Sequence, residues 1–385
     1  MTAIRRSWIF PAIFALCAGL AGCHLFRLAA AEPDEPGKKS EAEPAKPADQ
    51  QPAKPADQEP EKPADQAADA REGVPPEARR RLGGRLTDWR TKTLGGKQLW
   101  DDELLFQNWR IQRSALVGHC RLLDGDDRRE ARGSFEQCQE QLEEIKRERK
   151  LAPMKGTAVI ILHGLGGTRS TMRSLATYIE EKGGYTVLVV GYASTRSDIA
   201  AHARRLAGIV EHLDGIDEIH FVAHSLGNLI VRRYLGDSSR SETGGRPDPR
   251  IKRFVMIAPP NHGAAAAEAW SDGELFSLVL GKSAVELGSG WPDVEKTLAT
   301  PTCEFGVIAG GKGDDRGYNS RLEGDNDGLL SVATTRLVGA RDFVVVPVLH
   351  PFSTMNAKVQ EYTLRFLQEG YFISADERHP ITDSP

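Results

Sequence analysis

Between residues 153 and 371, short apolar runs alternate with longer amphipathic segments. The runs are rich in Val, Ile and Leu and predict buried strands, whereas apolar residues three and four apart predict helices. Strands that alternate with helices form parallel sheets covered on both faces, so the pattern predicts an α/β domain with a mostly parallel sheet. Strands are expected at residues 157–162, 185–192, 218–223, 253–258, 304–309 and 343–349, and helices at 168–182, 199–213, 226–235 and 354–368.

The pattern divides the 385 residues into five segments. They are an export signal (1–31), a Pro/Ala-rich disordered linker (32–74), a helical N-terminal extension (75–151), the α/β domain (152–373) and a flexible tail (374–385). The extension is assigned as helical because apolar anchors such as Trp100 and Trp109 stand among many charges of both signs. The net charge of −4 provides no basic excess for binding nucleic acid.

The first segment carries the features of a targeting sequence. Arg5 and Arg6 precede an apolar stretch (residues 8–20) that is too short to span a bilayer but fits an export signal. It ends in Leu20-Ala21-Gly22-Cys23, which is similar to the motif at which bacterial lipoproteins are cleaved and acylated on Cys. We therefore expect a cell-envelope protein anchored to the membrane through Cys23. Cleavage after residues 29–31, giving a periplasmic or secreted protein, is the alternative.

The linker and the cysteines give weaker indications. Lys-Pro-Ala-Asp-Gln occurs three times, at residues 46–50, 54–58 and 62–66. Residues 32–73 contain no aromatic and no β-branched residue, which predicts an extended tether. Cys120 and Cys138 could pair in an oxidising compartment or remain free, and the sequence leaves both states open. Cys303 opens an apolar run and is expected to be a buried thiol.

A serine stands where one predicted strand meets the next helix. Ala223-His224-Ser225-Leu226-Gly227 fits the nucleophile-elbow pattern G-x-S-x-G, with Ala in place of the first Gly. Residues 269–273 satisfy the same pattern, but Ser271 follows no predicted strand. The context therefore favours Ser225 as a nucleophile over a simple helix-capping serine.

A glycine-rich loop follows the first predicted strand of the domain. In His163-Gly164-Leu165-Gly166-Gly167, the glycines let the chain bend so that backbone N–H groups converge on one point. We expect the N–H groups of Leu165 and Leu226 to form an oxyanion hole. A plain turn or a phosphate loop are the alternatives, but the GK[ST] signature and the G-x-G-x-x-G spacing of nucleotide-binding loops are absent from this stretch.

Together with Asn326-Asp327-Gly328 and the later His350, these two motifs resemble the α/β-hydrolase superfamily. The Ala-His-Ser form of the elbow is similar to that of small bacterial lipases and esterases. The resemblance covers residues 153–371 and implies that Ser225 is the nucleophile, Asp327 the acid and His350 the base, in the chain order expected of this fold. The chain departs from the pattern at Asn228, where many relatives have Gly, and in its N-terminal extension.

The acid has to be chosen among three neighbouring carboxylates. Asp327 precedes Gly328 and two leucines, where the loop turns back toward the core, whereas Glu323 and Asp325 have polar neighbours. We therefore expect His350 Nδ1 to bond to Asp327 and His350 Nε2 to face Ser225.

Other polar residues near the predicted sheet edge are candidates for the substrate pocket: His163, His224, Asn261 and His262. Residues 264–302 form an apolar insertion that could be a lid over an acyl pocket or ordinary packing. The Asp-rich residues 314–327 could bind calcium but lack the EF-hand spacing, so calcium stays an open alternative there. No metal ligand is assigned and no cofactor is expected.

The favoured function is a serine esterase or lipase that acts on a small-molecule or lipid acyl ester. An acyltransferase or thioesterase would use the same three residues. A catalytically silent envelope-binding protein on a hydrolase scaffold is the alternative of a different class.

Overall fold

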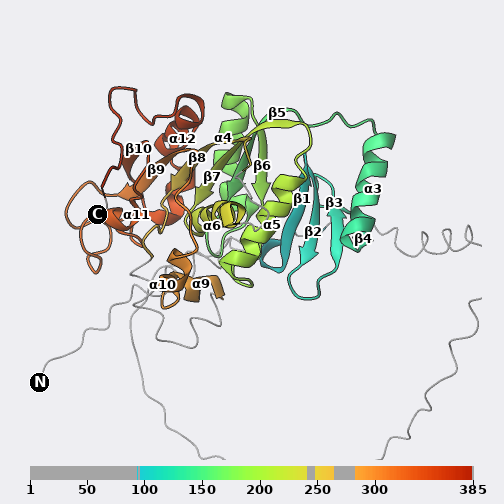
Figure 1. Cartoon of the computed structure of the whole chain (residues 1–385), viewed down its shortest axis with the longest axis horizontal. Helices are drawn as coiled ribbons and strands as arrows, with labels where there is room; N and C mark the ends of the chain where they lie inside the picture. The colour runs from blue at the N-terminus through green and yellow to red at the C-terminus, as the bar shows by residue number, and fades with distance from the viewer. Residues whose placement is uncertain (1–92, 94–95, 241–247, 264–281, 384–385) are drawn as a thin grey trace, which may run out of the picture. The chain divides into compact units, whose positions relative to one another are not determined.

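One parallel sheet forms the centre of the computed structural model (Figure 1). Its strands are β5 (Gly156–Leu162), β6 (Thr186–Val190), β7 (Ile216–His224), β8 (Ile251–Ile257), β9 (Glu304–Gly311) and β10 (Asp342–Pro347). They lie in the order β10-β9-β8-β7-β5-β6, and every neighbouring pair is parallel. The predicted strands are thus present, except that β10 ends at Pro347, so His350 follows the strand by a short turn.

The structure describes residues 93, 96–240, 248–263 and 282–383, all within the unit Thr87–Pro385. The export signal with Cys23, the linker, residues 75–92 of the extension and residues 264–281 of the insertion lie outside this range. What the sequence predicts for these segments stays a prediction. Among the described helices, none is both long and apolar enough to cross a membrane.

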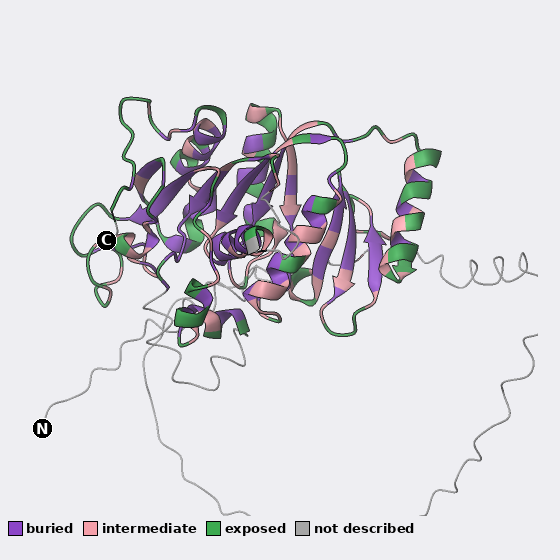
Figure 2. Cartoon of the chain, in the orientation of Figure 1, coloured by how far each residue is buried: buried purple, intermediate pink, exposed green. Residues whose placement is uncertain are grey.

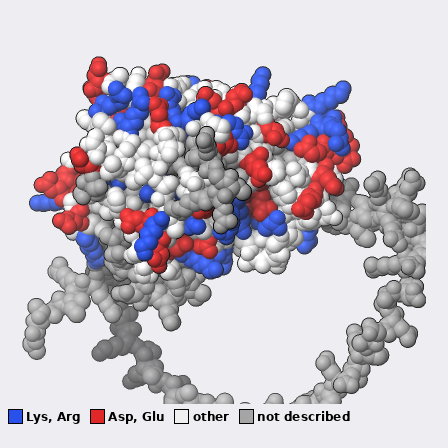
Figure 3. Space-filling model, viewed as in Figure 1, with Lys and Arg blue, Asp and Glu red and all other residues white. Residues whose placement is uncertain are grey.

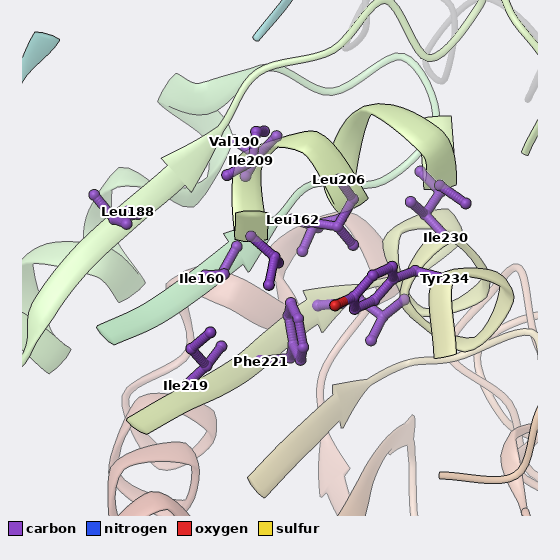
Figure 4. Close-up of a cluster of buried hydrophobic side chains, with 14 of the residues drawn as sticks. Ile160, Leu162, Leu188, Val190, Leu206, Ile209, Ile219, Phe221, Ile230 and Tyr234 are labelled. Carbon is purple, nitrogen blue, oxygen red and sulfur yellow. The ribbon is translucent and has the colours of Figure 1, made fainter. Parts of the chain in front are cut away.

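Helices cover both faces of the sheet. The larger ones are α4 (Arg173–Gly183), α5 (Ile199–Glu211), α6 (Leu226–Arg240) and α12 (Ala357–Glu369). Successive strand residues point to opposite faces, so Ile160 and Leu162 of β5 join the core beneath α5 and α6 (Figure 4), while Val159 and Ile161 join the core beneath α4 and α12. Burial on both faces explains why these strands read as continuous apolar runs.

The short helical elements complete the domain. They are the turns η3 (Arg169–Met172) and η4 (His350–Met355), and the helices α9 (Lys282–Leu287), α10 (Trp291–Glu295) and α11 (Val332–Thr335). Buried residues are concentrated in the sheet and exposed residues on the outer sides of the helices (Figure 2). On the face seen in Figure 3, acidic and basic side chains of the described residues are intermingled.

The helical assignment of the N-terminal extension is wrong for most of its described part. Residues 100–133 form an antiparallel sheet of four strands: β1 (Trp100–Phe106), β2 (Trp109–Ser114), β3 (Cys120–Leu123) and β4 (Arg129–Gly133). Only α3 (Phe135–Glu148) is the expected charged helix, and Ser134 caps it. The prediction failed because it placed charges on the surface, whereas Asp101, Asp102 and Arg110 are at most 3% exposed.

The cysteine and tail predictions can also be compared with the structure. Cys120 and Cys138 are buried free thiols, and burial raises the pKa of Cys120 to about 11 and that of Cys138 to about 12. Cys303 is a free thiol that is partly buried against the core.

The tail predicted as flexible is ordered through residue 383. Ile381 is 2% exposed, and its backbone exchanges hydrogen bonds with Gly339 and Ala340. The buried side chain and these backbone hydrogen bonds together anchor the segment.

Candidate active site

Ser225 lies in a strained turn between β7 and α6. The strand ends at His224 and the helix begins at Leu226, so Ser225 alone makes the turn, with a φ of +53°. This left-handed conformation is costly for a non-glycine residue and is the geometry expected of a nucleophile elbow. The turn is secured because Ser225 N donates to Ile257 O at 3.0 Å and Asn228 N donates to Ser225 O at 3.0 Å.

Glycines allow the loop after β5 to approach the elbow. A Cβ added at Gly164 would lie 3.0 Å from Ser225 Cβ, and one added at Gly227 would lie 2.9 Å from both His163 O and Leu162 Cβ. At both positions a side chain would occupy space that the facing chain already fills. The two motifs found in the sequence therefore meet at one place.

The Gly227→Ala variant should be less stable than the native chain by about 1–3 kcal/mol, because backbone and Leu162 must move to admit the methyl group. Urea unfolding measures the loss. Gly208→Ala in α5 is the matched control: its Cβ would meet only Glu103 O, at 3.9 Å, so we expect no loss there and a gain of up to about 1 kcal/mol. Equal losses in the two variants would contradict the close approach of the loop to α6.

Three side chains from separate loops form a continuous hydrogen-bonded chain. Ser225 Oγ lies 3.0 Å from His350 Nε2, and His350 Nδ1 lies 2.6 Å from Asp327 Oδ2. The carboxylate can only accept, so Nδ1 carries the proton, and Nε2 is left to accept from the serine hydroxyl. Asp327 is 1% and His350 is 6% exposed.

The environment of Asp327 keeps it charged. Its Oδ1 accepts the backbone N–H groups of Leu329 (3.0 Å) and Leu330 (2.7 Å). Burial raises the pKa of Asp327, but His350 and these donors outweigh burial, and the pKa lies below its ordinary value. Gly310 at the end of β9 makes room, since a Cβ there would lie 2.7 Å from Asp327 Cβ.

The competing carboxylate in the same loop has a different role. Asp325 accepts backbone N–H groups from Lys312 at 2.7 Å and Gly313 at 2.9 Å, and so closes the loop after β9. Glu323 is exposed, and the carboxylate bonded to His350 is that of Asp327. Of the three carboxylates considered, the structure brings Asp327 to His350.

His224 contacts the backbone of the candidate base. Its Nε2–H donates to His350 O at 3.2 Å, and Ser353 Oγ donates to the same carbonyl at 3.0 Å. Burial lowers the pKa of His224 to about 3, with a further contribution from His350, so His224 is neutral. His224 therefore supports the backbone of His350.

The candidate oxyanion donors belong to the two segments that meet at Ser225. Within the described residues, the backbone N–H groups of Leu165 and Leu226 donate no hydrogen bond to another backbone group. Leu226 begins α6, where the partial positive charge of the helix N-terminus favours an anion.

A family model described as the alpha/beta hydrolase fold matches residues 157–278, which include the glycine-rich loop and the elbow. The chain has the α/β-hydrolase fold. The expected resemblance is thereby confirmed at the level of the fold. A search of curated proteins finds no match.

Solved structures similar to this hydrolase fold include several bacterial proteins. The product of the gene lin2722 from Listeria innocua is 16% identical, with 60% of this chain and 100% of that chain covered and a TM-score of 0.41. Lipase BlEst2 from Bacillus licheniformis is 18% identical, with coverages of 55% and 89% and a TM-score of 0.38. Phospholipase PlaB from Legionella pneumophila is 21% identical, with coverages of 47% and 44% and a TM-score of 0.37.

The remaining candidates for the substrate pocket are Asn261, His262 and His163, and their contacts are with residues other than Ser225. Asn261 is 1% exposed and is bonded to Arg232 and to Thr335 O, so it has a structural role. His262 lies at the surface, where its Nδ1 is 3.6 Å from Glu295 Oε1. His163 is fully buried, stacks on Tyr192 at 4.0 Å, and has its pKa lowered by burial to about 4.

The described part of the insertion packs against the domain. In α9, Ser283 Oγ donates to Ser197 O at 2.8 Å and Glu286 accepts Ile199 N at 2.8 Å, which ties α9 to the start of α5. Residues 264–281, the other part of the predicted lid, lie outside the described residues.

One supporting residue was noted in the sequence only as a departure. Asn228 Nδ2 donates to Ser225 O at 2.9 Å and to Ile257 O at 3.2 Å, so it ties the elbow to β8. A glycine at this position could not make these bonds.

Proposed function

We propose that this protein is a serine hydrolase that cleaves carboxylic ester bonds through an acyl-enzyme on Ser225. The observation that carries the proposal is the unbroken chain of hydrogen bonds from Ser225 through His350 to Asp327, at 3.0 and 2.6 Å. Ser225 precedes both Asp327 and His350 by more than a hundred residues. The fold brings the three side chains together in an arrangement with a specific use in acyl transfer.

The proposed reaction has two stages. His350 Nε2 takes the proton of Ser225 as Oγ attacks the acyl carbon, and then returns it to the departing alcohol. Water, deprotonated by the same nitrogen, releases the acid from Ser225. Asp327 keeps His350 in the reactive tautomer and stabilises its cation.

Charge also develops on the former carbonyl oxygen. In this proposal the N–H groups of Leu165 and Leu226 bind it, each contributing about 3 kcal/mol to the transition state. The partial positive charge at the N-terminus of α6 acts in the same direction.

The test is labelling of the whole chain with an alkyl fluorophosphonate, combined with a panel of p-nitrophenyl esters of increasing chain length. We expect turnover of at least one ester and modification of Ser225, with activity lost in proportion to the label found in the Ser225 peptide. A chain that hydrolyses no ester and takes up no label would support a silent scaffold and overturn the proposal. Transfer to an added alcohol in preference to water would instead indicate an acyltransferase.

A further inference from the structure

The glycine-rich loop (residues 163–167) depends on groups outside itself for its conformation. Gly166 has a φ of +69°, and a Cβ placed there would have no heavy atom within 4 Å. Close packing therefore does not fix the conformation of the loop at this residue. Hydrogen bonds hold it instead. Gly166 N donates to Ser194 Oγ at 3.0 Å, and Gly167 O accepts from Gln98 Nε2 at 2.5 Å.

Gln98 joins this loop to a second one. While its Nε2 donates to Gly167 O, its Oε1 accepts Ser194 Oγ at 3.2 Å, Thr195 N at 3.2 Å and Thr195 Oγ1 at 3.1 Å. Ser194 in turn accepts Gly166 N, so the contacts form a closed ring. A carboxamide suits this place because its NH₂ group can donate to one loop while its oxygen accepts from the other.

The segment that carries Gln98 is itself fixed. Gln98 lies in the turn η2 (Lys97–Leu99), immediately before β1. In β1, Asp102 exchanges hydrogen bonds with Gly191 through both its backbone N–H and its carboxylate, and Asp101 accepts Ala193 N at 2.9 Å. Both carboxylates are at most 1% exposed, so the antiparallel sheet is firmly joined to the loop after β6.

From these contacts we propose that Gln98 is a positioning residue for the oxyanion hole, which it serves by fixing the backbone of Gly166 and Gly167 next to Leu165. The segment that leads into the antiparallel sheet, outside residues 157–278, then supports the reaction indirectly. The inference rests on the proposed ester hydrolysis. A donor that is displaced binds the developing charge less well but leaves ground-state binding unchanged.

The Gln98→Met variant tests this inference. We expect kcat for a short p-nitrophenyl ester to fall by about 10- to 100-fold, less than the full loss of one oxyanion donor, with KM within about twofold of the native value. Affinity for a trifluoromethyl ketone, which forms an anionic tetrahedral adduct, should fall by the same factor as kcat. Ser194→Ala should behave similarly, and the double variant should lose less than the product of the two effects.

Two further variants keep the test interpretable. Gln98→Glu keeps the acceptor for Thr195 but cannot donate to Gly167 O, and should lose activity like Gln98→Met. Gln107→Met is the matched control, because Gln107 follows β1 directly, as Gln98 precedes it closely, and donates to Ala152 O at 2.7 Å, away from the loop. It should keep native kinetics.

Several outcomes would overturn the inference. The first is a native kcat in Gln98→Met. The second is a loss of ketone affinity in Gln98→Met no greater than that in Gln107→Met. The third is a fall in the kcat of Gln98→Met no larger than the fall in its folded fraction, measured by circular dichroism. Failure of the proposed function looks different, because the native chain would then neither turn over esters nor label at Ser225. A Ser225→Ala variant that is inactive beside a fully active Gln98→Met variant would refute only the role of Gln98.

Discussion

The Ser225→Ala variant is expected to lose ester turnover by about five to six orders of magnitude in kcat. Without Oγ there is no atom to attack the acyl carbon, and His350 and Asp327 then have no proton to move. Residual hydrolysis should reflect only the bound ester and the oxyanion donors. The fold should persist, since His350 is the one hydrogen-bond partner of Ser225 Oγ among the residues that the structure describes.

The measurement is kcat of purified variants, with the melting temperature as a check on folding. Ser271→Ala is the control, because residues 269–273 satisfy the same pentapeptide pattern as the elbow. It should retain nearly native activity. Comparable losses in the two variants, or turnover by Ser225→Ala near the native rate, would refute the assignment of the nucleophile.

A second large effect is expected for Asp327→Asn, with a fall in kcat of about 10⁴-fold near neutral pH. The new amide can donate to His350 Nδ1, which moves the imidazole proton to Nε2. The base then has no free lone pair for the Ser225 hydroxyl. The geometry of the site should change little, because the Asn side chain can still accept Leu330 N.

Asp325→Asn provides the comparison within the same loop. Asp325 accepts backbone N–H groups of Lys312 and Gly313. Its replacement should therefore lower the free energy of unfolding and leave kcat of the folded protein nearly unchanged. Activity and urea unfolding measured on both variants separate the two roles. A greater loss of kcat in Asp325→Asn than in Asp327→Asn would refute the assignment of the acid.

The parallel sheet can be predicted from the sequence because its strands are buried on both faces. Val159, Ile160 and Ile161 all need apolar surroundings, so the strand stands out as an unbroken run. The elbow can be predicted for a similar reason, since a sharp strand-to-helix turn demands small residues at fixed offsets from Ser225.

The antiparallel sheet cannot be predicted in this way. Its polar residues pair with one another or with distant backbone: Gln112 donates to Asp102, and Arg121 donates to Gln112 and stacks on Trp100 at 3.8 Å. A pattern that assigns charges to the surface has no means of detecting such partners. The same holds for Gln98, whose partner Gly167 is 69 positions away.

The ordered C-terminal tail bears on how this protein behaves in concentrated solution. Strand β10 is an outer strand of the parallel sheet, and the outer strand of an open sheet offers unpaired backbone groups to other chains. Here Asp342, at the start of β10, accepts the N–H groups of Phe372 and His379, and Ile373 and Pro380 border the same hollow as Val344 and Val345. The tail thus occupies the approach to this edge, and a second copy would have to displace it before extending the sheet.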